Sequence, residues 1–271
     1  MTLRLLSYNI QVGGIGREKA IAAVIQECEP DIVVLQEAVD PEVVKRLASE
    51  CAMKHWGSTP GYSLGFLSRI EIEHYAWHRV RWARRAYLEL VPVDSNFTLF
   101  GVHLSGIHSN LTERRRAYEL RAVLAGIKPD LHGCHIVIGD FNTLAPGEQL
   151  DARRLPPRLR AVLWMTGRTI RWLTIQLMLE AGYVDAYRLF HAEDEGFTFP
   201  TWDPHVRLDY AFVPKRYVAI LNSCDVVRSV QAASQASDHF PLLADVTAAR
   251  VRSRVDGDSV DQHPRAQEIL E

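Results

Sequence analysis

The sequence predicts an α+β fold in which two mixed, largely antiparallel sheets pack as a sandwich with helices outside. Two observations predict this fold. Strand-like apolar runs follow one another between residues 64 and 104 with little room for helices, and no regular alternation of strands and helices runs through the chain. The composition agrees, because 47% hydrophobic and 24% charged residues in a chain of 271 are typical of a globular protein and exclude a disordered one. A net charge of −2 excludes the strong basic excess of a nucleic-acid coat protein.

The first unit along the chain is predicted to be a strand, a helix and a second strand. Leu3–Ile10 is an apolar run that is expected to form a buried strand. In Arg17–Glu29 the apolar residues recur every three or four positions, which is the spacing of one helix face, and Pro30 ends the helix. Asp31–Gln36 is a short run rich in β-branched residues and predicts the second strand.

The middle and the end of the chain contribute further strands and one clear helix. Thr112 is a candidate N-cap for a helix that runs to about Ile127 with its apolar residues on one face. We expect His55–Pro60 to form a loop. The remaining strands are predicted at Leu64–Ser68, Glu73–Val80, Tyr87–Val93, Phe97–Leu104, His135–Ile138, Arg207–Val213, Val218–Val227 and Leu242–Thr247.

Residues 1–249 are expected to form a single domain, followed by a flexible polar tail at 250–271. An insert at about 143–180 is rich in Arg and Trp, is interrupted by prolines, and is predicted to be a loop followed by a helix. Its composition is typical of a helix at a membrane surface, so peripheral membrane contact through residues 151–180 is one interpretation, and a helix that covers the sandwich is the other. No signal peptide or spanning stretch is evident, so we expect a cytoplasmic monomer without an obligate protein partner.

Polar side chains fall at or near the ends of several predicted strands. Each one alone has an ordinary explanation as a solvated residue or a turn, because Asp and Asn bond their own backbone in turns. Their joint position indicates one rim of a sheet pair that carries chemistry. These residues are Asn9, Glu37, His103, Asp140, Asn142, Asp209, Asp238 and His239.

A competing motif, GYSLG at Gly61–Gly65, matches the Gly-x-Ser-x-Gly elbow that presents a nucleophilic serine. That elbow requires a strand before it and a helix after it. Here a predicted loop precedes the motif and a predicted strand follows it. A simple turn is therefore the better interpretation.

Six motifs, taken together and in this order, resemble the endonuclease/exonuclease/phosphatase superfamily, which includes pancreatic deoxyribonuclease, apurinic endonucleases, neutral sphingomyelinases and inositol polyphosphate phosphatases. The motifs are SYN (Ser7–Asn9), LQE (Leu35–Glu37), VHLS (Val102–Ser105), GDFN (Gly139–Asn142), RLDY (Arg207–Tyr210) and SDHFP (Ser237–Pro241). They span nearly the whole chain, and GDFN and SDHFP together are the most specific. The resemblance implies an α/β fold of the four-layer α/β/β/α sandwich type and hydrolysis of phosphoesters that depends on Mg²⁺ or Mn²⁺.

A metal ion of this kind prefers oxygen ligands and neutralises both the phosphate and the leaving oxyanion. Glu37 is the expected carboxylate ligand, with Asn9 contributing its amide oxygen and Asp238 a second carboxylate. Relatives with a second metal place an acid two positions after the asparagine, where this chain has Gln11. We therefore favour one dominant metal ion.

The other rim residues are expected to perform the chemistry. Asp140 orients or deprotonates the attacking water, and Asn142 donates its amide to a phosphate oxygen. Asp209 bonds one nitrogen of His239 and raises its basicity. His103 donates to a nonbridging oxygen as negative charge grows. Whether His239 or Asp140 takes the proton from water stays open at this point.

The substrate class is less well defined by the sequence than the reaction. Arg84 and Arg85 lie in a stretch that interleaves Arg with Trp, which favours contact with a phosphate backbone or bases, although a solvated strand face has the same pattern. We expect a phosphodiester hydrolase acting on a nucleic acid, a nucleotide or a phospholipid headgroup. The alternatives are a phosphomonoesterase, a phospholipid or sphingomyelin phosphodiesterase, and a non-catalytic scaffold that retains the fold.

Overall fold

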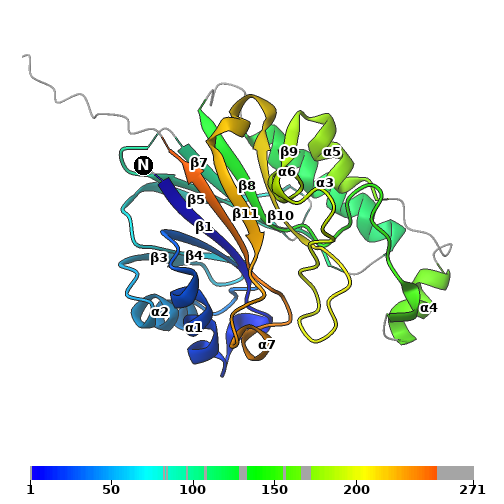
Figure 1. Cartoon of the computed structure of the whole chain (residues 1–271), viewed down its shortest axis with the longest axis horizontal. Coiled ribbons are helices and arrows are strands. Elements are labelled where there is room, and N and C mark those ends of the chain that lie inside the picture. Colours follow the sequence, from blue (N-terminus) through cyan, green and yellow to red (C-terminus); the bar gives the residue numbers. More distant parts are fainter. Residues whose placement is uncertain are drawn as a thin grey trace, which may run out of the picture.

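A computed structural model describes residues 2–248 of the chain, except 82, 84, 96, 107–108, 128–132, 155–156 and 166–171. Figure 1 shows the arrangement of the elements. The strands are β1 (Thr2–Asn9), β2 (Ile32–Gln36), β3 (His55–Ser58), β4 (Leu64–Ser68), β5 (Ile72–Arg79), β6 (Ala86–Pro92), β7 (Phe97–His103), β8 (Cys134–Asp140), β9 (Tyr183–Asp185), β10 (Asp209–Pro214), β11 (Leu221–Val226) and β12 (Leu242–Thr247). The α-helices are α1 (Glu18–Cys28), α2 (Pro41–Glu50), α3 (Asn110–Gly126), α4 (Pro157–Met165), α5 (Thr174–Glu180), α6 (Ala186–Phe190) and α7 (Ala233–Ala236), and 3₁₀ turns lie at Val12–Gly14, Ala152–Arg154 and Lys215–Ile220.

The strands form two six-stranded sheets with closely similar organisation. Sheet 1 has the order β11-β12-β1-β2-β4-β3, and sheet 2 has the order β5-β6-β7-β8-β10-β9. Each sheet contains one parallel pair among otherwise antiparallel neighbours, β1 with β2 in sheet 1 and β7 with β8 in sheet 2. A parallel pair needs a crossover connection, which α1 provides in sheet 1 and α3 in sheet 2. The predicted pair of mixed, largely antiparallel sheets is confirmed.

The two sheets pack face to face, and helices cover their outer faces, which makes four layers (Figure 1). Alternate residues of β1 point to opposite sides. Leu3 and Leu5 belong to the core between the sheets, whereas Leu6 and Tyr8 pack with residues of α1, α2 and α7. On the outer face of sheet 2, Phe100 and its neighbours pack against α3 and α5. Central strands that are buried on both faces explain the continuous apolar runs in the sequence.

The topology brings the carboxyl ends of the two parallel pairs to the same edge of the sandwich. In sheet 1 the register places Asn9 opposite Gln36, one residue before Glu37. In sheet 2 it places His103 opposite Asp140. The edge beyond the carboxyl ends of parallel strands is where α/β proteins commonly bind ligands. The fold therefore gathers the polar rim that the sequence predicts.

Three local predictions are wrong. The N-cap of α3 is Ser109, whose hydroxyl accepts from the Thr112 backbone N–H, and not Thr112 itself. Residues 55–58 of the predicted loop form β3, at the edge of sheet 1, because they pair with β4. The predicted strand at Val218–Val227 begins only at Leu221, since Lys215–Ile220 is a 3₁₀ turn. Helix α2 was not predicted, although Asp40 caps it and Pro41 occupies its first turn. The turn interpretation of the GYSLG motif holds, because β4 and not a helix follows Ser63.

The Arg- and Trp-rich insert contains two helices of different environments. In α5, Ile175 and Met178 are buried against sheet 2, as expected for a helix that covers the sandwich. In α4, Trp164 and Met165 are exposed, and the helix stands apart from the body in Figure 1. Within the described residues, no helix combines the length and the apolar character that crossing a membrane requires. The predicted tail at 250–271 lies outside the described residues.

Candidate active site

The first part of the site follows β1 and β2 in sheet 1. Asn9 is buried, and its Nδ2 donates to Glu37 Oε1 at 3.4 Å and, across the sandwich, to Asp140 Oδ2 at 3.0 Å. The backbone N–H groups of Gln11 and Val12 donate to Asn9 Oδ1 and Glu37 Oε2. Glu37 has a φ of 57°, a left-handed conformation that non-glycine residues seldom adopt and that often accompanies function. These contacts fix the directions of both side chains.

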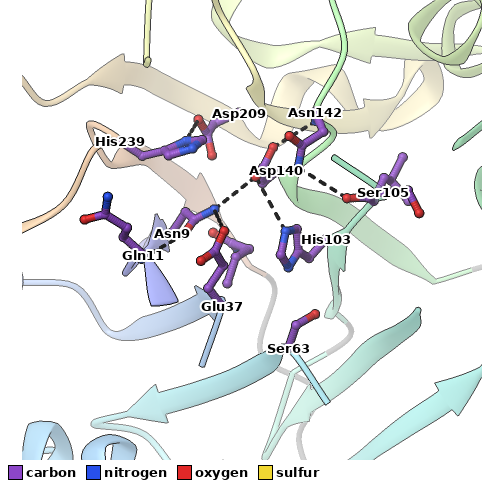
Figure 2. Close-up of polar contacts among 12 residues, drawn as sticks. Asn9, Gln11, Glu37, Ser63, His103, Ser105, Asp140, Asn142, Asp209 and His239 are labelled. Atoms are coloured by element: carbon purple, nitrogen blue, oxygen red, sulfur yellow. Dashed lines mark hydrogen bonds and ion pairs between the residues drawn. The ribbon is translucent and has the colours of Figure 1, made fainter. Parts of the chain in front are cut away.

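The second part follows β7 and β8 in sheet 2. Asp140 is buried at the end of β8, and its Oδ1 accepts from the Asn142 backbone N–H at 2.8 Å. Its Oδ2 accepts from Asn142 Nδ2 at 2.8 Å and from Asn9 Nδ2, while His103 Nε2 lies 3.8 Å away. Asn142 Nδ2 also donates to the Leu104 carbonyl at 3.2 Å. Three hydrogen bonds therefore hold the Asp140 carboxylate in one orientation (Figure 2).

The third part pairs β10 with the loop before β12. His239 Nδ1 donates to Asp209 Oδ2 at 2.8 Å, and both side chains are buried. The register of sheet 2 places Asp209 opposite Asp140, which brings this pair to the same rim. Ser237 fixes the loop, because its hydroxyl donates to the Asn9 carbonyl at 2.6 Å and accepts from the His239 backbone N–H at 3.2 Å. Sequence reasoning did not give Ser237 a role, although it opens the SDHFP motif.

The site drives two of its groups to unusual protonation equilibria. Burial and the nearby Asp209 carboxylate raise the pKa of Asp140 to about 7. For His239, burial opposes the charged ring, but the Asp209 carboxylate and its hydrogen bond prevail and raise the pKa to about 10. At neutral pH, His239 is therefore a cation paired with Asp209, and Asp140 is close to its own titration point.

Of the two arginines predicted to bind phosphate, the structure describes only Arg85. Arg85 Nη1 donates to Ser63 Oγ at 3.0 Å and to His103 Nδ1 at 3.1 Å. It also lines a cavity of about 530 Å³ together with Ser63, Thr112 and Arg115. Arg84 lies outside the described residues.

The residues predicted to hold a metal ion form a set of oxygen donors that fits a hard cation. Glu37 and Asp238 are only half-buried, and Asn9 contributes an amide oxygen beside them. Burial raises the pKa of Asp238, the His239 charge opposes this rise and the Glu37 carboxylate adds to it, so the two acids lie close enough to interact. Asp209 also has an oxygen, Oδ1, that is buried without a hydrogen-bond partner among the described residues.

One close group of potential ligands occurs in the part of the chain that the structure describes. Ligand atoms of Asp140, Asp209 and His239 all lie within 4.8 Å of one another. The hydrogen bond between Asp209 and His239 already occupies one of these oxygens and the Nδ1 nitrogen. This group is therefore better suited to hold protons than a metal ion.

A buried ionic network behind the rim was missed by sequence reasoning. Glu113 and Arg116 of α3 form an ion pair at 2.8 Å, and Arg116 Nη1 donates to the Ser105 carbonyl, two residues after His103. Thr143, which follows Asn142, donates its hydroxyl to Glu113 at 2.8 Å. The run of charges at 113–116 is typical of a solvated surface, but Glu113 and Arg116 lie in helical register with the buried Ala117. That periodicity could have identified them.

The fold and the rim together define an α/β sandwich protein that carries acids and histidines where the parallel strands of its two sheets end. The chain belongs to the endonuclease/exonuclease/phosphatase family, whose model matches residues 6–239. The family name denotes enzymes that cleave phosphoester bonds. No curated protein matches the chain significantly.

Solved structures share this fold at low sequence identity. A variant of the 3′ phosphatase NExo from Neisseria, bound to a product DNA hairpin, is 18% identical with a TM-score of 0.67, and the match covers 90% of this chain and 99% of that one. An endonuclease/exonuclease/phosphatase from Beutenbergia cavernae is 20% identical with a TM-score of 0.68, over 91% and 72%. A humanized TDP2 of D. rerio is 18% identical with a TM-score of 0.64, over 91% and 99%. The predicted four-layer sandwich and the family resemblance are confirmed.

Proposed function

We propose that the protein hydrolyses phosphodiester bonds with the help of a bound Mg²⁺ or Mn²⁺ ion. The observation that carries the proposal is the convergence of residues that are distant in the sequence. Residues 9, 37, 103, 140, 209 and 239 are far apart along the chain, yet direct contacts such as that of Asn9 with Asp140 join them at one rim of the sandwich. Chance seldom gathers two carboxylates, an acid–histidine pair and a further histidine at one sheet edge. Such a group is suited to attack on an anionic ester.

Glu37, Asn9 and Asp238 would hold the ion. They are oxygen donors, and the Glu37 carboxylate contributes to the raised pKa of Asp238, so the two acids lie close enough to share a cation. The chemistry that a bound Mg²⁺ or Mn²⁺ supplies is neutralisation of the phosphate and of the leaving oxyanion. The neutral Gln11 side chain beside them favours one ion over two.

Asp140 is the proposed general base. It takes the proton of the attacking water while the new bond to phosphorus forms and the ester bond to the leaving oxygen breaks. A base works best when its pKa is close to the working pH, and burial together with Asp209 raises the pKa of Asp140 to about 7. Asn9 and Asn142 hold the carboxylate in place through their Nδ2 groups.

His239 is the proposed cationic donor to the phosphate. Because Asp209 keeps its ring charged at neutral pH, it suits charge stabilisation better than proton abstraction. His103 supplies a second donor from the opposite side of Asp140. The two histidines thus flank the base (Figure 2).

A nucleic acid is the favoured substrate class. The structural neighbours include a 3′ phosphatase bound to product DNA and a 3′-5′ exonuclease, both from Neisseria, and both share the fold with this chain. Arg85 beside the rim offers a cation for a phosphate chain. A phospholipid headgroup is the competing substrate, and the exposed Trp164 and Met165 of α4 are the feature that favours it.

The test is hydrolysis of bis-p-nitrophenyl phosphate by the full chain with Mg²⁺, with Mn²⁺ and with a chelator. We expect turnover only with metal, and a loss of about 10²- to 10⁴-fold in His239→Ala. The matched control is His191→Ala, a surface histidine bonded to Asp225, which should leave turnover unchanged. Metal-independent turnover, or full activity in His239→Ala, would overturn the proposal and favour a scaffold that retains the fold.

Substrate class is decided by comparing nicking of plasmid DNA with headgroup release from liposomes. We expect the DNA to be cleaved at the higher rate. If lipid is the substrate, deletion of 153–165 should reduce headgroup release and leave hydrolysis of the small chromogenic ester intact.

A further inference from the structure

Arg85 is half-buried just before β6, and its guanidinium contacts two uncharged groups. In the part of the chain that the structure describes, its hydrogen-bond partners are the Ser63 hydroxyl at 3.0 Å and the His103 ring at 3.1 Å, and no carboxylate pairs with it. Both bonds use Nη1, so each of its two hydrogens has one acceptor. The hydrogen bond to Ser63 therefore fixes the guanidinium in an orientation that points the other Nη1 hydrogen at His103.

The chemistry of the two groups decides where the His103 proton lies. A guanidinium only donates hydrogen bonds and stays charged in proteins. His103 Nδ1 must therefore offer a lone pair to Arg85, which leaves the ring neutral with its one proton on Nε2. Burial, the Arg85 charge and the His239 charge lower the pKa of His103 well below its ordinary value, in agreement with this bond.

We infer that Arg85 is a positioning residue, which holds His103 as a neutral ring with its proton on Nε2 and directs that proton toward the reaction centre. The inference rests on the proposed function, because that proposal defines where the reaction centre is. The hydrogen bond from Arg85 to His103 does not depend on it. The GYSLG motif gains a role here, since its Ser63 anchors the guanidinium and is not a nucleophile.

The surroundings of His103 explain why a guanidinium is needed. The charged or titratable groups that face the ring are Asp140 from β8, Arg85 before β6 and His239 from the loop before β12. Asp140 favours a protonated ring, because its Oδ2 lies 3.8 Å from Nε2. A charged His103 would pair with the base and withdraw it from water. Arg85 opposes that outcome by charge repulsion and by using the Nδ1 lone pair.

The Nε2 proton of His103 is also available for a hydrogen bond to a substrate. A separation of 3.8 Å from Asp140 Oδ2 is too long for a hydrogen bond, so this proton has no acceptor at that distance. A phosphate oxygen that comes within hydrogen-bond distance of Nε2 would accept it. The two histidines thus differ in protonation state, because Asp209 keeps His239 charged and Arg85 keeps His103 neutral.

The test is a long-range ¹H–¹⁵N spectrum of the full chain labelled with ¹⁵N-histidine, recorded at pH 6 with His103 assigned through His103→Asn. In the wild type we expect an unprotonated Nδ1 and a protonated Nε2. In Arg85→Met we expect the single pattern to be lost and the proton to be shared between Nδ1 and Nε2, because no donor then holds the Nδ1 lone pair, while burial and the His239 charge still keep the ring neutral. Arg85→Lys should restore the wild-type pattern, and Arg46→Met, at a remote surface arginine, should leave it unchanged.

The kinetic arm uses the same variants and the chromogenic diester. We expect kcat of Arg85→Met to fall about 10- to 100-fold with a smaller change in KM, and Arg85→Lys to recover part of kcat. A doubly protonated His103 in the wild type, an unchanged spectrum in Arg85→Met, or an effect on KM alone would overturn the inference. The wild-type spectrum decides even if Arg85→Met does not fold. The spectra need no substrate, so a wild type without turnover would overturn only the proposed function.

Discussion

Replacing Glu113 by Gln should destabilise the protein far more than the same replacement at a surface ion pair. Glu113 is 1% exposed, and every hydrogen bond that the structure gives its carboxylate is internal. Its Oε2 accepts from Arg116 and Thr143, and its Oε1 accepts from Thr174 and the Leu173 backbone. Glutamine keeps the size of the side chain but removes its charge. It also places an NH₂ group, itself a donor, where a carboxylate oxygen accepted hydrogen bonds.

The magnitude follows from the burial of the partner. Arg116 is fully buried, so Glu113→Gln takes away its ion-pair partner, and removing one partner of a buried pair costs about 3–5 kcal/mol. Arg46 and Glu18 form an ion pair of the same length, 2.8 Å, but half of the Arg46 side chain is exposed. Glu18→Gln should therefore cost less than about 1 kcal/mol. Burial, and not distance, makes the difference.

The assay is urea unfolding followed by tryptophan fluorescence. With a denaturant slope of about 3 kcal/mol/M, the midpoint of Glu113→Gln should fall by about 1–2 M, and that of Glu18→Gln by less than about 0.4 M. Equal shifts in the two variants would refute the reasoning, because they would mean that burial of the Arg116 charge carries no penalty.

The pH dependence of this effect has a defined sign. Burial raises the pKa of Glu113, but the Arg116 charge and the hydrogen bonds from Thr174 prevail and lower it below its ordinary value. A carboxyl whose pKa is lower in the folded state stabilises the fold above its unfolded pKa of about 4.3, and this stabilisation is lost as the pH falls through the folded value. The stability difference between wild type and Glu113→Gln should therefore shrink below about pH 4.

Three further outcomes test the site and the core. Asp209→Asn should lower kcat about 10³- to 10⁴-fold with the fold intact, because His239 loses the carboxylate that sets its charge; a kcat within tenfold of the wild type would contradict the pairing. Glu37→Gln should raise the Mn²⁺ concentration needed for half-maximal turnover, measured by metal titration, and an unchanged value would remove Glu37 from the metal site. The four cysteines should react with a thiol reagent only after unfolding, since all are buried and the pKa of Cys28 is raised to about 11; rapid labelling of the native protein would contradict this.

Much of the site was predictable because its residues occupy strand ends. Apolar runs define β1, β2, β7 and β8 in the sequence, and the polar residue that closes each run marks the rim. Asn9 and Asp140 could be found in this way. Their direct hydrogen bond could not, because it joins two sheets whose packing depends on the whole core.

Contacts that depend on tertiary approach were not predictable. The bond from Arg85 to His103 joins two residues that are 18 positions apart, and nothing in the local pattern selects that partner. Strand β3 was missed for a similar reason. Gly57 weakens a strand prediction, yet it is required there because a Cβ at this position would lie 2.4 Å from the Phe66 ring. Helix α2, in contrast, carried its signals in Asp40 and Pro41.

The pairing of β1 with β12 has a consequence for synthesis of the protein on the ribosome. The first strand emerges with Asn9 early in translation, but its antiparallel neighbour β12 is the last strand of the part of the chain that the structure describes. His239 and Asp238 precede that neighbour directly, and Ser237 secures them to the carbonyl of Asn9. A nascent chain thus cannot complete the rim until translation has passed residue 247, and under the proposed function we expect it to lack phosphodiesterase activity until then.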